Sequence, residues 1–136
     1  MKYSKKQRIK NKTELIEKYD KDTVIQSFLN LEKLSNSEVN AMKKIEDEIF
    51  KSLYKLITEE IEINSSLGKK IYHYHKKWLS FSIENISSSM HKEIVRLYVY
   101  DHRFSKYYVY RNINMSQSLL DIVHFFQNNN FKFSKF

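Results

Sequence analysis

The stretch that decides the fold class runs from residue 35 to residue 58 and reads SNSEVNAMKKIEDEIFKSLYKLIT. Ser35, followed three residues later by Glu38, is typical of a capping box, in which each side chain bonds to a backbone N–H of the other residue. Behind it, apolar residues recur every three or four positions for about six turns, which predicts a long amphipathic helix. These apolar residues are Val39, Met42, Ile45, Ile49, Leu53, Leu56 and Ile57.

Shorter segments on both sides of this stretch follow the same periodicity. Leu15, Ile16 and Tyr19 predict a short helix near the start, and each later segment follows residues that cap helices well. The sequence therefore predicts an all-α bundle of about five to seven helices, and nowhere does it favour a strand. The expected caps are Asp22 or Thr23, Asn64–Ser66, Ser87–Ser89, Asp101, and Asn114 or Ser116.

Composition excludes several classes of protein. A chain of 136 residues predicts one domain. It has no cysteine and no proline, and Gly68 is its one glycine. Disulfides, thiolate zinc sites and a cysteine nucleophile are thereby excluded, and so are the glycine-rich phosphate-binding loops. An all-β fold is disfavoured, because tight hairpins need residues that accept positive φ.

The net charge of +8 is unevenly distributed. Residues 1–12 contain six basic side chains and no acid, so most of the charge lies in a short arm. A solvated, flexible terminus is the favoured interpretation, and binding of the arm to nucleic acid is the alternative. Neither a signal peptide nor a membrane-spanning run is present in the sequence, so we expect no membrane partner and a cytoplasmic location.

Catalytic and metal-binding patterns are weak. On a helix His73 and His75 lie about 200° apart and cannot share a metal ion, so ordinary surface or interface histidines are expected. The acidic run Glu59, Glu60 and Glu62 is expected to be a solvated helix end that frays or has compensating contacts. The sequence therefore predicts no enzyme, no metal and no cofactor.

Aromatic density is the most distinctive feature of the chain. Five of the six aromatic residues between positions 98 and 110 are tyrosines, which suit half-wet pockets that hold amphipathic ligands. Trp78, the one tryptophan, is expected on the helical face that meets them. Core packing is the competing explanation for any one of these rings. The six residues are Tyr98, Tyr100, Phe104, Tyr107, Tyr108 and Tyr110.

Residues 91–108, which read HKEIVRLYVYDHRFSKYY, resemble the TipAS family of antibiotic-recognition domains. These domains occur at the C-terminus of TipA-like MerR regulators and as freestanding drug-binding proteins. The resemblance extends in the right order over residues 14–126. The matching features are Leu97-Tyr98-Val99, Asp101, Arg103-Phe104 and Tyr107-Tyr108, together with Tyr19, His75, Trp78, Leu119 and Asp121.

The resemblance implies a globin-like fold with a deep apolar cleft that binds cyclic thiopeptides or other hydrophobic, peptide-like antibiotics. It also implies a lid, so we expect a basic arm at 1–13, short lid helices at 14–34, a ligand-binding core at 35–127 and a polar, aromatic tail at 128–136. The expected ligand-binding residues are Trp78, Tyr98, Phe104, Tyr107, Tyr108, His75 and Tyr74 in the core, with Tyr19 and Phe28 from the lid.

Three departures from the family pattern bear on how this chain is expected to bind and use its ligand. Without cysteine, any capture of the drug is non-covalent. Asn114 stands where the family has a glycine, an exchange that a left-handed backbone would tolerate. No DNA-binding domain precedes residue 14, which favours sequestration. The alternatives are the ligand-sensing half of a split MerR-type regulator that contacts a protein partner through residues 131–136, and nucleic-acid binding by the basic arm.

Overall fold

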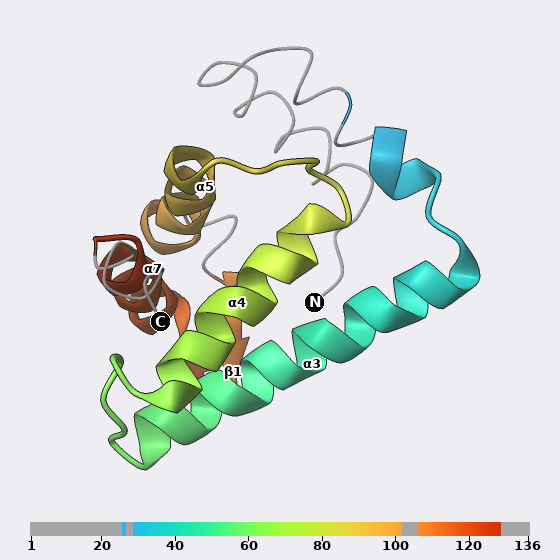
Figure 1. The fold of residues 1–136 in the computed structure, drawn as a ribbon. Helices are drawn as coiled ribbons and strands as arrows, with labels where there is room; N and C mark the ends of the chain where they lie inside the picture. The colour runs from blue at the N-terminus through green and yellow to red at the C-terminus, as the bar shows by residue number, and fades with distance from the viewer. Residues whose placement is uncertain (1–25, 27–28, 102–105, 129–136) are drawn as a thin grey trace.

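The computed structural model describes residue 26 and residues 29–101 and 106–128 of the chain (Figure 1). The basic arm, Tyr19, Phe28, Phe104 and most of the tail lie outside these residues. The described part is mostly helical, which confirms the all-α prediction. Its elements are α3 (Asn36–Thr58), α4 (Ser66–Ser80), α5 (Ser88–Tyr100), the 3-10 helix η1 (Lys106–Tyr108), β1 (Val109–Tyr110), β2 (Ile113–Asn114) and α7 (Ser116–Asn128).

Helix α4 occupies the centre of the bundle. It packs on α3 on one side and on α7 on the other, and α5 packs on α7 (Figure 1). The four helices thereby enclose a single hydrophobic core. None of the helices in the described ranges is both long enough and apolar enough to cross a membrane.

The helix starts follow the sequence prediction. Ser35 and Glu38 form the capping box, with 3.2 Å from the Glu38 backbone N to Ser35 Oγ and 3.0 Å from the Ser35 backbone N to Glu38 Oε1. Ser65 accepts a hydrogen bond from the backbone N–H of Gly68, and Ser87 accepts one from that of Met90. Such caps stabilise a helix by about 1 kcal/mol each.

Helix α3 ends before the acidic run rather than fraying within it. Glu60 adopts the left-handed conformation with φ of 53°. Its N–H bonds to the carbonyl oxygen of Ile57, and that of Ile61 bonds to the carbonyl oxygen of Leu56, which together form a Schellman motif. The compensating contacts expected at this end are therefore backbone hydrogen bonds.

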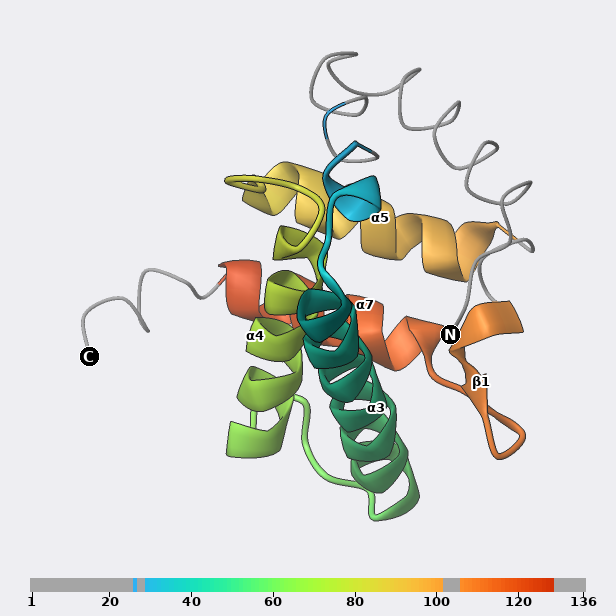
Figure 2. The same cartoon turned by 90° about the vertical axis from the view of Figure 1, so that its right-hand side faces the viewer.

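A short hairpin corrects the expectation that the chain forms no strand. Val109 pairs with Asn114, and Tyr110 pairs with Ile113, in an antiparallel ladder next to η1 (Figure 2). The turn residues Arg111 and Asn112 have φ of 49° and 67°, the pattern of a type I′ turn. An arginine thus takes a conformation that usually favours glycine, asparagine or aspartate, and this is why the sequence pattern missed the hairpin.

Asn114 differs from its predicted role as the replacement of a left-handed glycine. Its backbone belongs to β2, and the left-handed residues of this segment are those of the turn. The Asn114 side-chain oxygen accepts hydrogen bonds from the Ser116 N–H and hydroxyl, at 3.0 and 2.8 Å. It therefore assists the start of α7 through its side chain.

The most deeply buried aliphatic side chains come from all four helices and are fully shielded from solvent. Burying each of them stabilises the fold by about 1.5–3 kcal/mol. We call this set the aliphatic core: Leu53, Ile71, Val95, Leu119, Ile122 and Val123.

Gly68 sets how closely the loop after α3 approaches α4. A Cβ at this position would lie 1.8 Å from the carbonyl oxygen of Ile63. The first turn of α4 therefore packs against backbone that leaves no room for a side chain.

Candidate functional site

A connected set of buried rings lies beside the aliphatic core. Its members come from α3, α4, α5 and η1, and each contacts the next through stacked, tilted or edge-on geometry. We call this set the aromatic cluster: Phe50, Tyr72, His75, Trp78, His91, Tyr98 and Tyr108.

Tyr108 joins the α3 side of the cluster to the α5 side. Its ring stacks on Phe50 of α3 with 5.5 Å between centroids, and on Tyr98 of α5 with 4.3 Å. Tyr108 stands on the three-residue helix η1, and its carbonyl oxygen accepts a 2.7 Å hydrogen bond from the Met115 N–H. A ring supplied by a short connecting segment therefore lies between rings supplied by two longer helices.

Helix α4 contributes His75 and Trp78, which its 3.6-residue period places on one face. Their rings stack with 6.0 Å between centroids. Tyr98 stands edge-on to His75 at 5.7 Å, so the α4 and α5 contributions meet at this imidazole. Trp78 therefore lies on the α4 face that is turned towards the tyrosines, as expected, and His75 lies between Trp78 and Tyr98.

His75 and His91 form a buried pair, which corrects the expectation of ordinary surface or interface histidines. They are 1% and 0% exposed, and 2.9 Å separates His75 Nδ1 from His91 Nε2. The outer nitrogens, His75 Nε2 and His91 Nδ1, are buried, and neither has a hydrogen-bond partner among the residues that the structure describes. His73, two residues before His75, is exposed as expected. Within the described ranges no three His, Asp or Glu side chains gather in a way that could hold a metal ion.

The environment keeps both imidazoles uncharged at neutral pH. Burial lowers the pKa of His91 to about 4, and the nearby charge of Lys76 adds to this effect. Burial likewise lowers the pKa of His75 well below its ordinary value, and His91 contributes. Each ring therefore has one N–H and one lone pair.

Besides the two imidazoles, the polar groups at the cluster include the hydroxyls of Tyr98 and Tyr108 and the carboxyl group of Glu46. Burial raises the pKa of the Tyr98 hydroxyl, while its hydrogen bond with Tyr108 lowers it and the charge of Glu46 raises it. Glu46 itself is a buried residue of α3, and burial raises the pKa of its carboxyl group. The cluster thus combines stacked rings with buried polar atoms.

The structure brings together four of the expected ligand-binding residues: Trp78, His75, Tyr98 and Tyr108. Tyr74 is half-buried on α4, with Lys70 Nζ 5.3 Å from its ring centroid. The Tyr107 side chain, like Phe104, Tyr19 and Phe28, lies outside the described structure. Sequence reasoning missed Phe50, Tyr72, His91 and Glu46, although Phe50 and Tyr72 directly follow apolar residues of their helical stripes.

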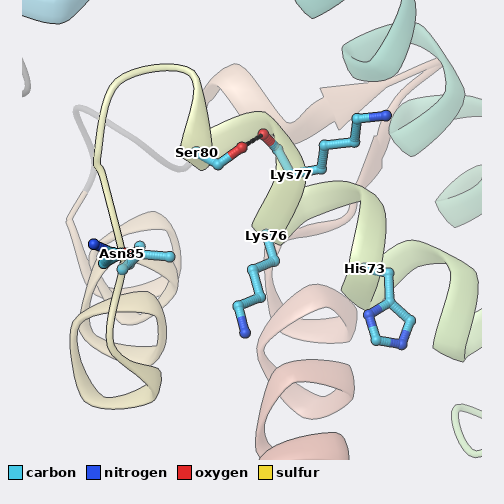
Figure 3. A pocket seen from close by; sticks show the side chains of 6 residues that line it. His73, Lys76, Lys77, Ser80 and Asn85 are labelled. Carbon is cyan, nitrogen blue, oxygen red and sulfur yellow. Dashed lines mark hydrogen bonds between the residues drawn. The ribbon is translucent and has the colours of Figure 1, made fainter.

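A pocket of about 620 Å³ opens on a different surface, along α4 and the loop that follows it (Figure 3). Its lining includes two lysines and an isoleucine, and it contains none of the expected ligand-binding residues. The lining residues are His73, Lys76, Lys77, Ser80, Asn85 and Ile86.

The structure is thus an all-α domain in which stacked aromatic rings and two imidazoles are buried together. The family model of the TipAS antibiotic-recognition domain matches residues 12–126, and the chain belongs to this family. This is a family of ligand-recognition domains and not one known for catalysis. Comparisons with curated proteins and with solved structures gave no significant match.

Proposed function

We propose that this chain binds and sequesters a hydrophobic peptide-type antibiotic, thiopeptide-like or similarly polyaromatic, without forming a covalent bond. The observation that carries this proposal is the run of rings from Phe50 through Tyr108, Tyr98 and His75 to Trp78. Membership of an antibiotic-recognition family supports the class of ligand.

The ring run supports binding of planar groups at the Tyr108 position. Phe50 and Tyr98 stand on helices of 23 and 13 residues, whereas Tyr108 stands on a segment of three. A planar ring of the drug that displaced Tyr108 would stack on both neighbours. Each such aromatic contact contributes about 0.5–1.5 kcal/mol beyond the burial of its area.

Non-covalent capture follows from the composition, because the chain contains no cysteine to attack a dehydroamino acid. After incubation with a thiopeptide and denaturation, intact mass spectrometry is expected to return the unmodified mass of the chain. An adduct of the drug mass would contradict this part of the proposal.

Binding itself is tested with a panel of thiopeptides and albicidin-like compounds at many-fold excess. Trp78 is the one tryptophan, so ligand stacking near His75 is expected to quench its emission and to raise the melting temperature. N-acetyltryptophanamide with the same compounds corrects for absorption by the drug. If no compound changes either signal, the proposal is wrong.

A matched pair of variants locates the binding. Phe50→Leu removes one stacking surface and is expected to weaken binding about tenfold. Tyr100→Leu removes an aromatic residue that is 70% exposed and is expected to leave the affinity unchanged. Equal loss in both variants would argue against the aromatic cluster as the site.

Whether binding serves sequestration or sensing is a separate question. Sequestration, and with it resistance in the cytoplasm, predicts that the chain alone protects a sensitive cell in proportion to its amount. The alternative, the sensing half of a MerR-type regulator, predicts co-purification with a DNA-binding partner when the drug is present.

A further inference from the structure

We infer that the His75–His91 pair is the polar recognition element of the proposed drug site, and that it binds neutral amide or azole groups through its two outer nitrogens. This inference rests on the proposed function and specifies what the site recognises. It starts from two buried nitrogens, His75 Nε2 and His91 Nδ1, for which the described part of the chain supplies no hydrogen-bond partner.

The hydrogen-bonding capacity of the pair does not depend on its tautomer. A neutral imidazole has one donor nitrogen and one acceptor nitrogen. If His75 Nδ1 donates to His91 Nε2, then His75 Nε2 is left as an acceptor and His91 Nδ1 as a donor. If the bond runs the other way, the two roles exchange. In both arrangements the pair offers one unused donor and one unused acceptor.

A structural role alone does not account for this arrangement. Buried polar groups in folded proteins are nearly always hydrogen-bonded, because an unpaired one has lost its water without compensation. Two apolar side chains of similar volume would fill the same space without unpaired atoms. The pair therefore lowers the stability of the ligand-free fold, and a ligand that satisfies both nitrogens would remove that penalty.

The groups around the pair suit a ligand in which rings alternate with amides. Trp78 and Tyr98 contact His75, and the Tyr72 ring lies 5.4 Å from that of His91 at a tilt of 30°. Tyr98 also stacks on Tyr108. A drug ring that replaced Tyr108 on Tyr98 would therefore lie one ring away from His75, which Tyr98 contacts edge-on.

The absence of charge on the two imidazoles favours neutral ligands over anionic ones. Because burial keeps both imidazoles neutral, the pair gains nothing specific from an anionic group. Secondary amides present a donor and an acceptor, and azoles present a ring nitrogen that accepts. Peptide-type antibiotics built from these units therefore match the pair, whereas an all-hydrocarbon ring system does not.

The test is a double-mutant cycle of His75→Leu and His91→Leu, with the best-binding thiopeptide of the panel as the probe. Each single variant leaves the other imidazole with no partner and is expected to lower the melting temperature by about 5 °C or more. The double variant removes both unpaired nitrogens and is expected to be at least as stable as wild type. Its affinity is nevertheless expected to stay about tenfold below wild type.

The opposite behaviour of stability and affinity is the diagnostic result. A double variant that recovers both stability and wild-type affinity would overturn the inference, because a purely structural pair predicts that outcome. His73→Gln, which changes an exposed imidazole on the same helix, is the control and is expected to change neither. If wild type itself binds no compound, the proposed function is wrong. If wild type binds but the double variant binds equally well, only the inference about the histidine pair is wrong.

A second measurement applies even if the variants do not fold. In the wild-type chain labelled with ¹⁵N-histidine, the thiopeptide is expected to shift the resonances of His75 Nε2 and His91 Nδ1, the two nitrogens without partners. Shifts confined to exposed histidines such as His73 and His124, with those two nitrogens unchanged in the bound state, would overturn the inference.

Discussion

The aliphatic core and the aromatic cluster are both buried, but they differ in how completely their atoms are satisfied. The aliphatic core consists of side chains without polar atoms, so packing alone completes it. The aromatic cluster contains two imidazole nitrogens that bond to none of the described residues, next to stacked rings supplied partly by the short helix η1. Burial alone therefore does not make the two regions equivalent. Under our proposal the second region recognises the ligand, and the first contributes stability alone.

The largest expected effect is a loss of stability when a residue of the aliphatic core is truncated. Leu119→Ala empties a fully buried position on α7 and is expected to lower the free energy of unfolding by about 3 kcal/mol, measured by urea denaturation. Gln117→Ala, at an exposed position of the same helix, is the control and should change little. A loss below 1 kcal/mol for Leu119→Ala would contradict the assignment of stability to the aliphatic core.

The next effect concerns the backbone that holds α4 in place. Gly68→Ala forces a methyl group against the Ile63 carbonyl oxygen and is expected to lower the free energy of unfolding by about 2 kcal/mol. Thermal unfolding of the two proteins measures it. The affinity of the folded variant should remain, since Gly68 lies outside the aromatic cluster. An unchanged melting temperature would show that the loop moves without penalty.

A pH effect is expected from the aromatic cluster itself. The pKa of His91 is about 4 in the folded chain and about 6.5 when unfolded, so only the unfolded chain takes up the proton between these values. Stability is therefore complete above pH 6.5 and is lost as the pH falls towards 4, by about 1.4 kcal/mol per pH unit for each proton excluded. The measurement is urea unfolding as a function of pH.

The double variant His75→Leu/His91→Leu separates this effect from other titrating groups. The wild-type stability minus that of the double variant should fall with decreasing pH over this range. A difference that stays constant with pH would mean that the pair is already protonated, or is solvated, in the folded protein.

The smallest expected effect comes from a variant that separates the contribution of the Tyr98 ring from that of its hydroxyl. Tyr98→Phe keeps the stack on Tyr108 and removes the hydroxyl that bonds to it, so a loss of about 1 kcal/mol in unfolding free energy is expected. Calorimetry should find drug affinity within about threefold of wild type, because stacking is retained. A tenfold loss of affinity would assign recognition to the hydroxyl instead.

Local sequence signals predicted the helices well. Ser35 with Glu38, Ser65 and Ser87 cap the helices expected of them, because a cap is decided within four residues. Ile49, Leu53 and Leu56 of the predicted α3 stripe are buried, because one amphipathic helix has one core-facing side.

Local sequence patterns did not predict the features that depend on contacts between distant segments or on an unusual backbone conformation. The His75–His91 contact joins residues sixteen apart on two helices, and no periodicity in either helix indicates it. The burial of Glu46 likewise runs against the usual preference of a carboxylate for water. The hairpin depends on Arg111 at positive φ, where only its neighbour Asn112 is a usual turn residue. Aromatic density therefore predicted several of the rings that lie together in the aromatic cluster, but not its buried polar groups.

The most direct test of the account is calorimetric titration of the best-binding thiopeptide into wild type, Tyr98→Leu and Leu119→Ala at a temperature where all three are folded. The account predicts an affinity at least about tenfold weaker for Tyr98→Leu, and an affinity near wild type for the less stable Leu119→Ala. Equal affinities for wild type and Tyr98→Leu, or a loss only in Leu119→Ala, would contradict it.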